Sequence, residues 1–183
     1  LWLNLLSDGA PALALGLEKG DPDIMDRPPR PPDEPVINRE MTIGVLIQTV
    51  SITAVVLTAY WLGREFFAER TGVDPLIVGE TMAFVTLVMS ELFRAYTSRS
   101  ERYPLWKLGI FSNKWMQYAV GFSVALLMVV VYIPVPAVRE IFNTTPLTLE
   151  EWLVLIPLIL VPSIFAELQK YLIYQSNLVR VRR

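Results

Sequence analysis

The 183-residue sequence contains neither cysteine nor histidine. The missing cysteine excludes disulfide frameworks, cysteine-ligated zinc, iron–sulfur clusters and thiol nucleophiles. The missing histidine excludes a Ser-His-Asp triad and an imidazole proton relay within this chain. Charge is also scarce, at 19% of residues, compared with about 25% in an ordinary soluble domain. With 16 basic residues against 18 acidic ones, the chain is not a basic nucleic-acid binder, and its chemistry is left to carboxylates, amides, hydroxyls and backbone.

Long apolar runs are what the sequence has in abundance, with 53% hydrophobic residues and a mean hydropathy of +0.43. Met41 to Gly63 is 23 residues without a charge, about 34 Å as a helix at about 1.5 Å per residue. That length crosses a bilayer core of about 30 Å. The predicted fold is therefore all-α, a membrane bundle of five transmembrane helices. The spans are expected at about residues 1–17, 41–63, 80–97, 115–133 and 152–173.

The ends of the chain and its basic residues predict how the bundle sits in the membrane. Leu1 already lies within a hydrophobic run, so we expect the first helix to be truncated at its N-terminus and the chain to be a piece of a longer protein. If the segment after the first span is cytoplasmic, only Arg64, Arg70 and Arg139 of the 16 basic residues lie outside. The positive-inside rule favours this orientation. The C-terminus is then predicted to be cytoplasmic.

Polar side chains in the first span form a candidate cation site. Asn4, Ser7 and Asp8 have the spacing that places them on one face of a helix. Gly9 and Pro11 follow at once and would loosen the helix, since Pro11 has no N–H to donate to the carbonyl of Ser7. Oxygen ligands of this kind suit a hard cation such as Ca²⁺ or Na⁺. The alternative is that the three side chains only form hydrogen bonds between helices.

A second acidic residue, Glu91, falls in the third predicted span. Arg94 lies three residues further on, so a self-neutralising ion pair within the helix competes with a ligand role for Glu91. Arg94 could instead extend to the cytoplasmic interface and leave the carboxylate free. Glu167 and Lys170, near the end of the last span, are interpreted as an interfacial pair.

Three segments resemble the calcium-type P-type ATPases. LWLNLLSDGAPALALG, residues 1–16, resembles their sixth membrane helix, and DPDIMDRPPR, residues 21–30, looks like the cytoplasmic loop that follows it in the sarcoplasmic-reticulum-type pumps. SELFRAYTS, residues 90–98, is similar to the eighth helix of bacterial members. The five predicted spans agree with helices six to ten, so the resemblance implies that residues 1–183 are the C-terminal transport domain of such a pump.

The resemblance also implies roles for individual residues. The positions matching the family's cation ligands, which would hold the metal ion, are Asn4, Ser7, Asp8 and Glu91. The positions matching its coupling-loop carboxylates are Asp21, Asp23 and Asp26. One departure is Arg94, which stands where the animal calcium pump has an uncharged residue.

The implied function is ATP-driven transport of Ca²⁺ by the whole protein, an integral protein of the plasma membrane. The Asp-Lys-Thr-Gly-Thr phosphorylation motif is absent from this chain, so no catalytic residue is assigned and the chain alone should be inactive. Mg²⁺ and ATP would belong to the missing cytoplasmic domains. The implied partners are the lipid bilayer and the remaining helices and domains of the pump. The alternatives are a Na⁺ or Mn²⁺ pump, or a non-enzymatic membrane scaffold or channel subunit.

Overall fold

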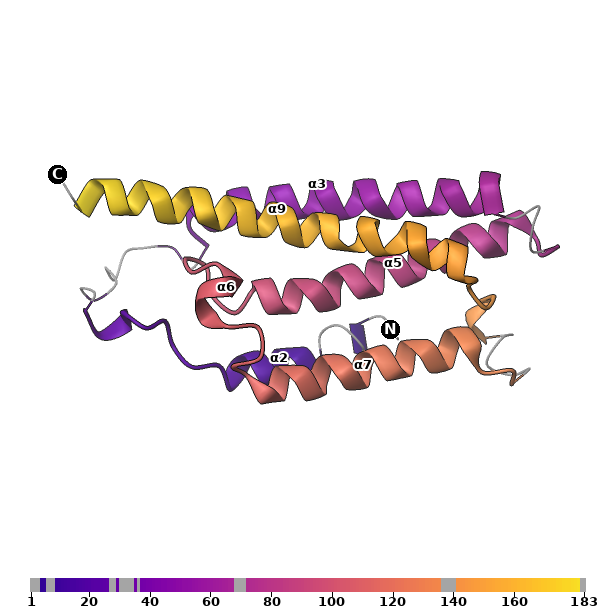
Figure 1. Ribbon diagram of the computed structural model, residues 1–183, viewed down its shortest axis with the longest axis horizontal. Coiled ribbons are helices and arrows are strands. Elements are labelled where there is room, and N and C mark those ends of the chain that lie inside the picture. Colours follow the sequence, from indigo (N-terminus) through magenta and orange to yellow (C-terminus); the bar gives the residue numbers. More distant parts are fainter. Residues whose placement is uncertain are drawn as a thin grey trace.

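The computed structural model describes residues 4–5, 9–26, 29, 35, 37–67, 72–135 and 141–181, with backbone only at residues 40 and 173–181. Every regular element in these ranges is a helix (Figure 1), which confirms the predicted all-α membrane bundle. Within the same ranges, four helices are long and apolar enough to cross a membrane, at Met41–Phe67, Pro75–Thr97, Lys114–Tyr132 and Leu149–Leu172. The first predicted span falls partly outside the described residues.

The elements follow one another along the chain with short connections. In order they are α2 (Ala10–Gly16), the 3₁₀ turn η2 (Ile24–Asp26), α3 (Arg39–Leu62), the π-helical turn η3 (Gly63–Phe67), α5 (Pro75–Thr97), α6 (Leu105–Leu108), α7 (Lys114–Tyr132) and α9 (Leu149–Val181). Helix α9 runs through Pro157 and Pro162 without ending.

Polar side chains define where the membrane helices begin. Asn38 accepts a hydrogen bond from the Met41 N–H at 2.8 Å and caps α3, and Asn113 does the same for α7. Asp74 caps α5 by accepting from the Leu76 N–H at 2.9 Å. Pro75 follows in the first turn, where its missing N–H costs nothing. Helix α5 therefore begins at Pro75, five residues earlier than the predicted span at 80–97.

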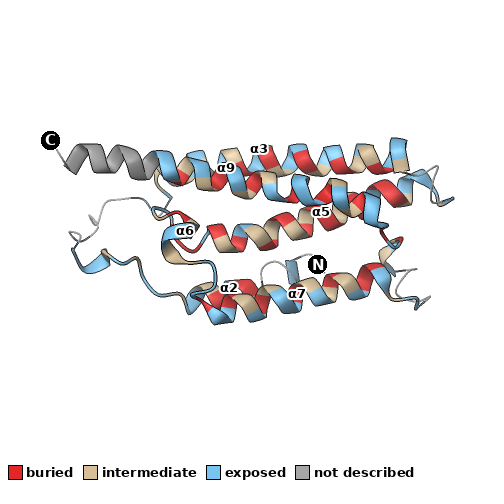
Figure 2. Ribbon diagram, viewed as in Figure 1, coloured by how far each residue is buried: buried red, intermediate tan, exposed pale blue. Residues whose placement is uncertain are grey.

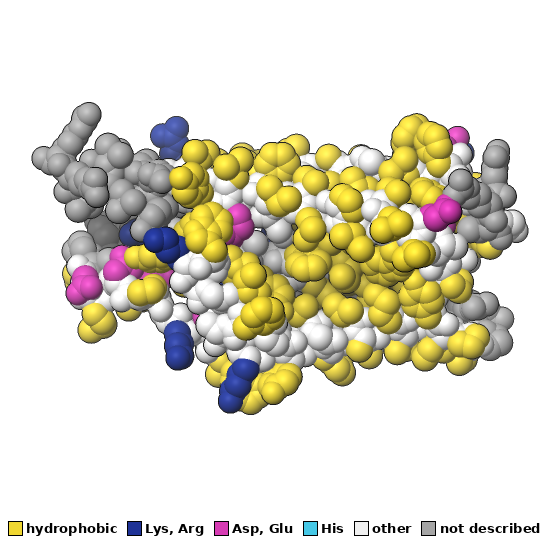
Figure 3. Space-filling view, viewed as in Figure 1, with side chains coloured by type: hydrophobic (Ala, Val, Ile, Leu, Met, Phe, Trp, Pro, Cys, Tyr) yellow, Lys and Arg dark blue, Asp and Glu magenta, His cyan; other side chains and the backbone are white. Residues whose placement is uncertain are grey.

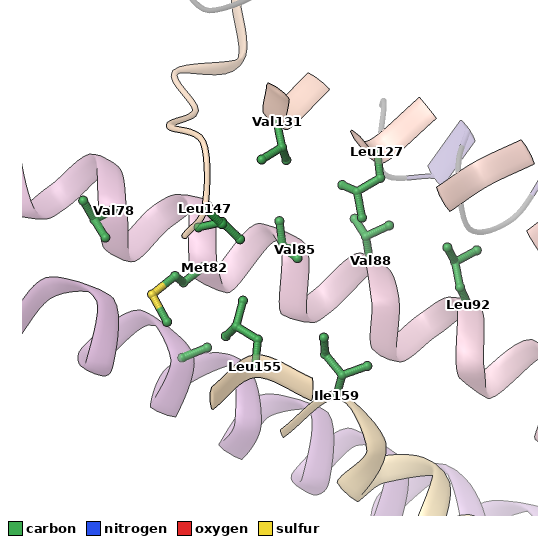
Figure 4. Packing of buried hydrophobic residues seen from close by; sticks show 11 residues of the cluster. Val78, Met82, Val85, Val88, Leu92, Leu127, Val131, Leu147, Leu155 and Ile159 are labelled. Atoms are coloured by element: carbon green, nitrogen blue, oxygen red, sulfur yellow. The ribbon is translucent and has the colours of Figure 1, made fainter. Parts of the chain in front are cut away.

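Helix α5 lies at the centre of the bundle. It contacts α3 and α9 on one side and α7 and α2 on the other (Figure 1). Half of its most apolar window is buried, compared with 17% for α3, and Figure 2 shows this difference along the two ribbons. Met82, Val85 and Val88 of α5 pack between Leu127 of α7 and Leu155 of α9 in the main core (Figure 4).

The outer surface is largely apolar between two charged ends. Figure 3 shows hydrophobic side chains over the middle of the molecule, and Lys and Arg side chains at the end where α6 lies. Leu46, Val50 and Leu57 of α3 and Leu153 and Ile164 of α9 are all exposed. Apolar surface of this extent in a soluble monomer would be exceptional. It is the surface that a helix bundle presents to lipid or to further membrane helices.

Two glycines allow α3 and α5 to approach closely at the end away from α6. A Cβ atom built on Gly79 would lie 2.9 Å from the carbonyl oxygen of Tyr60, and one built on Gly63 would lie 2.9 Å from the Cα of Gly79. Neither position has room for a side chain, so this helix crossing requires glycine at both. Small residues at close helix crossings are a common packing device in membranes.

Gly79→Ala is expected to destabilise the bundle by about 1–3 kcal/mol, because the new methyl group forces α3 and α5 apart. The matched control is Gly121→Ala in α7, where a Cβ atom meets nothing within 4 Å. Thermal unfolding of the full-length protein in neutral detergent measures both. Equal unfolding temperatures for the two variants would contradict the close crossing.

Candidate cation site and the adjoining polar cluster

The N-terminal segment supplies three of the four predicted cation ligands, but the structure describes little of it. Asn4 has helical backbone and an exposed side chain. Ser7 and Asp8 lie outside the described residues. Gly9 forms a π-type turn, and the regular helix α2 begins at Ala10, with Pro11 in its first turn and no side-chain cap. Single π-helical turns inside membrane helices are often found at functional sites.

Glu91, the fourth predicted ligand, is half-buried on α5. Ala95, one turn further along α5, packs against Ala14 of α2 in a second core cluster. Residues four apart share a helix face, so Glu91 lies on the face of α5 that meets α2. Helices α2 and α5 run in the same direction (Figure 1). Glu91 is therefore at the level of Ala10, where α2 begins and two residues after Asp8.

The ion pair between Glu91 and Arg94, one of the two alternatives left open by the sequence, is not found. In the described ranges no ion pair joins the two side chains, and Arg94 borders a cavity between α3, α5 and α9. Successive side chains are rotated by about 100° around the axis of a helix. Glu91 and Arg94 therefore point in different directions and can lie against different neighbouring helices. Likewise, no cluster of three or more acidic side chains suited to a metal occurs among the described residues.

The three coupling-loop carboxylates lie after α2. Asp21 is half-buried and accepts a hydrogen bond from the Ser100 hydroxyl at 2.7 Å, which ties it to the segment following α5. Asp23 is also half-buried, and its carbonyl accepts from the Asp26 N–H at 3.1 Å in the η2 turn. The Asp26 side chain is exposed. The segment is thus anchored near its start and exposed at Asp26.

The strongest polar contact in this region was not predicted from the sequence. Arg99, whose side chain is 1% exposed, binds Glu18 through two hydrogen bonds, Nε to Oε2 at 2.7 Å and Nη2 to Oε1 at 2.9 Å. Its Nη1 donates to the carbonyls of Gly109 and Ile110. Such a bidentate pair is stronger and more directional than an ordinary ion pair. It fastens the end of α2 to both sides of the α5–α7 connection.

Asn113 completes this cluster. Its side-chain amide donates to the Ala14 carbonyl at 3.0 Å and to Glu18 Oε2 at 2.7 Å, while its oxygen caps α7. The hydrogen bond from Arg99 is the main cause that lowers the pKa of Glu18, and burial of the carboxylate opposes it. We call Glu18, Arg99 and Asn113 the α2 clamp. No local sequence pattern predicts the α2 clamp, because Glu18 and Arg99 are 81 residues apart in the chain.

A second contact joins α9 to the same end of the bundle. Lys170 pairs with Glu167 at 2.9 Å, which confirms the predicted interfacial pair, and also donates to the Thr97 carbonyl at the end of α5. Glu167 in turn accepts from the Leu105 N–H at 2.6 Å. Helices α5, α6 and α9 are therefore held together where they leave the membrane.

The fold and its polar ends define an integral membrane protein with an acidic residue inside the bundle. The chain belongs to the family described as "Cation transporting ATPase, C-terminus", whose model matches residues 1–172. This confirms the resemblance drawn from the motifs.

Several curated relatives match nearly the whole chain. It is 32% identical to Calcium-transporting ATPase 1 of Bacillus cereus over 93% of this chain and 20% of the relative. It is 34% identical to Calcium-transporting ATPase 1 of Schizosaccharomyces pombe over 100% of this chain and 19% of the relative. It is 32% identical to Calcium-transporting ATPase type 2C member 2 of Mus musculus, over 100% of this chain and 18% of the relative. The chain thus spans about a fifth of the length of these relatives.

Glu18→Gln is expected to lower the free energy of unfolding by about 2–3 kcal/mol, because Arg99 then remains buried without its carboxylate. The matched control is Glu65→Gln, which removes the partner of Arg64 from an exposed pair 3.5 Å apart. An exposed pair contributes about 0–1 kcal/mol. Chemical or thermal unfolding of the full-length protein distinguishes them, and equal losses would show that the α2 clamp contributes nothing beyond surface charge.

The contribution of Glu18 should also depend on pH in a defined direction. Its pKa in the folded protein lies below the ordinary value of 4.5. The stabilisation is therefore fully present above pH 4.5 and is lost as the pH falls towards the lowered pKa. The difference in stability between wild type and Glu18→Gln should be constant from about pH 6 to 8 and shrink at lower pH. A difference that grows on acidification would contradict this.

Proposed function

We propose that this chain is the C-terminal membrane part of an ATP-driven cation pump and that it contributes ligands to an intramembrane site for Ca²⁺. Family membership and relatives named as calcium-transporting ATPases support this proposal. Because the chain spans about a fifth of those relatives, ATP and Mg²⁺ would be bound by parts of the protein outside it. No catalytic residue is proposed within these 183 residues.

The observation that carries the proposal is the position of Glu91. A carboxylate within a membrane helix is costly unless it meets a partner, an ion or water. Glu91 is not paired with Arg94. It lies level with Ala10, where α2 starts, and Ala10 is two residues after Asp8 in the chain. Asn4, Ser7 and Asp8 add an amide, a hydroxyl and a second carboxylate. Ca²⁺ takes six to eight oxygen ligands, so backbone carbonyls and other helices of the pump would complete the site.

The segment after α2 would transmit ion binding to the rest of the pump. Asp21 is bonded to Ser100 and the α2 clamp holds Glu18, so α2 and the α5–α7 connection would move as one body. Asp26 is exposed beyond these anchors. Asp21, Asp23 and Asp26 are proposed as the carboxylates through which a shift of α2 reaches the cytoplasmic domains.

The distribution of basic side chains supports one orientation of the bundle in the membrane. The basic side chains visible in Figure 3 gather at the end where α6 lies, and cytoplasmic segments of membrane proteins are enriched in Lys and Arg. We therefore place α6, the segment after α2 and the C-terminus in the cytoplasm. The membrane is proposed to be the plasma membrane.

Asp8→Asn and Glu91→Gln in the full-length pump test the ion site. Asp8→Asn should abolish phosphorylation by ATP at micromolar Ca²⁺, because a charged oxygen ligand of the ion is lost. Glu91→Gln should raise the Ca²⁺ concentration for half-maximal phosphorylation about tenfold, since ligand charge sets the affinity of oxygen sites. Radiolabelled ATP and quantification of the phosphoenzyme provide the measurement.

The matched control for Glu91→Gln is Glu80→Gln, an exposed glutamate of the same helix three turns away. It should leave the Ca²⁺ dependence unchanged. Unchanged phosphoenzyme levels in both Asp8→Asn and Glu91→Gln would remove this pair of carboxylates from the site and the proposal with them. The same titration with Na⁺ or Mn²⁺ in place of Ca²⁺ identifies the preferred ion.

A further inference from the structure

A polar cavity of about 300 Å³ opens between α3, α5 and α9 at the α6 end of the bundle. Its size is at the lower limit of pockets that hold small ligands or headgroups, about 300–1,000 Å³. Three basic side chains line it, Arg94, Arg102 and Lys170, and Glu101 is the acidic residue beside them. The cavity therefore carries an excess of positive charge and lies apart from the Glu91 face of α5.

Two of the three cations are not neutralised. Lys170 is paired with Glu167. Within the described part of the chain, neither the Arg94 nor the Arg102 guanidinium has a carboxylate within ion-pair distance. Arg94 lies in the last turn of α5 with an exposed side chain, three residues before the end of the apolar span at Thr97. An anion between these two arginines would pair with both.

Further groups at the cavity favour an anion. Asn38 and Met41, at the beginning of the 24-residue helix α3, line it, and the N-terminal end of a helix has a partial positive charge. The end of the cavity at the start of α3 is therefore favourable for an anion.

The level of the cavity along the membrane helices indicates which molecule supplies the anion. Met41 is the first residue of one candidate span, Thr97 is the last residue of another, and Lys170 is two residues from the end of a third. The cavity thus lies where three spans leave the hydrocarbon region together. Lipid phosphates occupy this layer, and basic pockets between membrane helices are known to bind anionic headgroups.

We propose that this cavity binds the phosphate headgroup of an anionic phospholipid, with Arg94 and Arg102 as its ion-pairing residues. The N-terminal end of α3 adds partial positive charge, and the acyl chains lie against the exposed apolar side chains of α3. Such a lipid bridges α3, α5 and α9 and neutralises the arginine that Glu91 leaves unpaired. The site is independent of cation transport and does not require the proposed function.

The full-length protein, purified in neutral detergent, allows a direct test with phosphatidylglycerol as the anionic lipid and phosphatidylcholine as the neutral one. Native mass spectrometry counts the lipid retained, and thermal unfolding measures its effect. Phosphatidylglycerol should be retained and should raise the unfolding temperature, whereas phosphatidylcholine should not. Arg94→Gln and Arg102→Gln should each weaken phosphatidylglycerol binding about fivefold, from about 1 kcal/mol per basic residue.

Arg64→Gln, at the opposite end of the bundle, is the matched control and should bind phosphatidylglycerol as the wild type does. Arg102 lies outside the membrane helices, so its variant remains informative if Arg94→Gln folds poorly. Unchanged binding in both variants would overturn the proposal, as would equal protection by inorganic phosphate, which would indicate a site for free phosphate. If Arg94→Gln lowers the stability equally with and without phosphatidylglycerol, Arg94 forms an ion pair with a carboxylate elsewhere in the pump and not with the lipid.

Discussion

The burial of α5 between four other helices is the constraint on which the rest of this structure depends. A polar group in hydrocarbon must find its hydrogen-bond partner within the protein. Helix α5 meets this requirement locally, since the hydroxyls of Thr81 and Thr86 donate to the carbonyls of Ile77 and Met82 one turn earlier. Because α5 is enclosed by α3, α9, α7 and α2, Glu91 can lie half-buried at a helix interface instead of facing lipid.

The polar clusters at the α6 end fix how far the helices are shifted along one another. Apolar side chains pack without strong directional preference, so the main core leaves the helices some freedom to slide along one another. The two hydrogen bonds between Arg99 and Glu18 and the contact from Lys170 to the end of α5 remove this freedom. They fix the level of α2 relative to Glu91 and tie α2 and α9 to the segments that follow α5.

Much of the fold could be predicted from the sequence because its causes are local. The charge-free run from Met41 to Gly63 is long enough to need a membrane, and the predicted span at 115–133 agrees closely with α7. The start of α5 was placed too late because Glu80 interrupts the apolar run, although Asp74 and Pro75 are a capping pair that begins the helix earlier. The candidate ligands were found because a carboxylate in a membrane span is rare and an unusual motif surrounds Asp8. Their arrangement around an ion stays a prediction, since Ser7 and Asp8 lie outside the described residues.

The apolar spans, the all-α class and the family follow from the order of the amino acids alone, because hydropathy and motifs depend on residues that are close in the chain. The Glu167–Lys170 pair also followed from it, but the partners of Glu91 and Glu18 did not. Spacing left Glu91 and Arg94 as a plausible pair and offered nothing to join Glu18 to Arg99 across 81 residues. Helix packing determined the outcome for both pairs. The helices that lie against α5 determine where each of its side chains points, and a charged side chain can pair only with a group that those helices bring within reach.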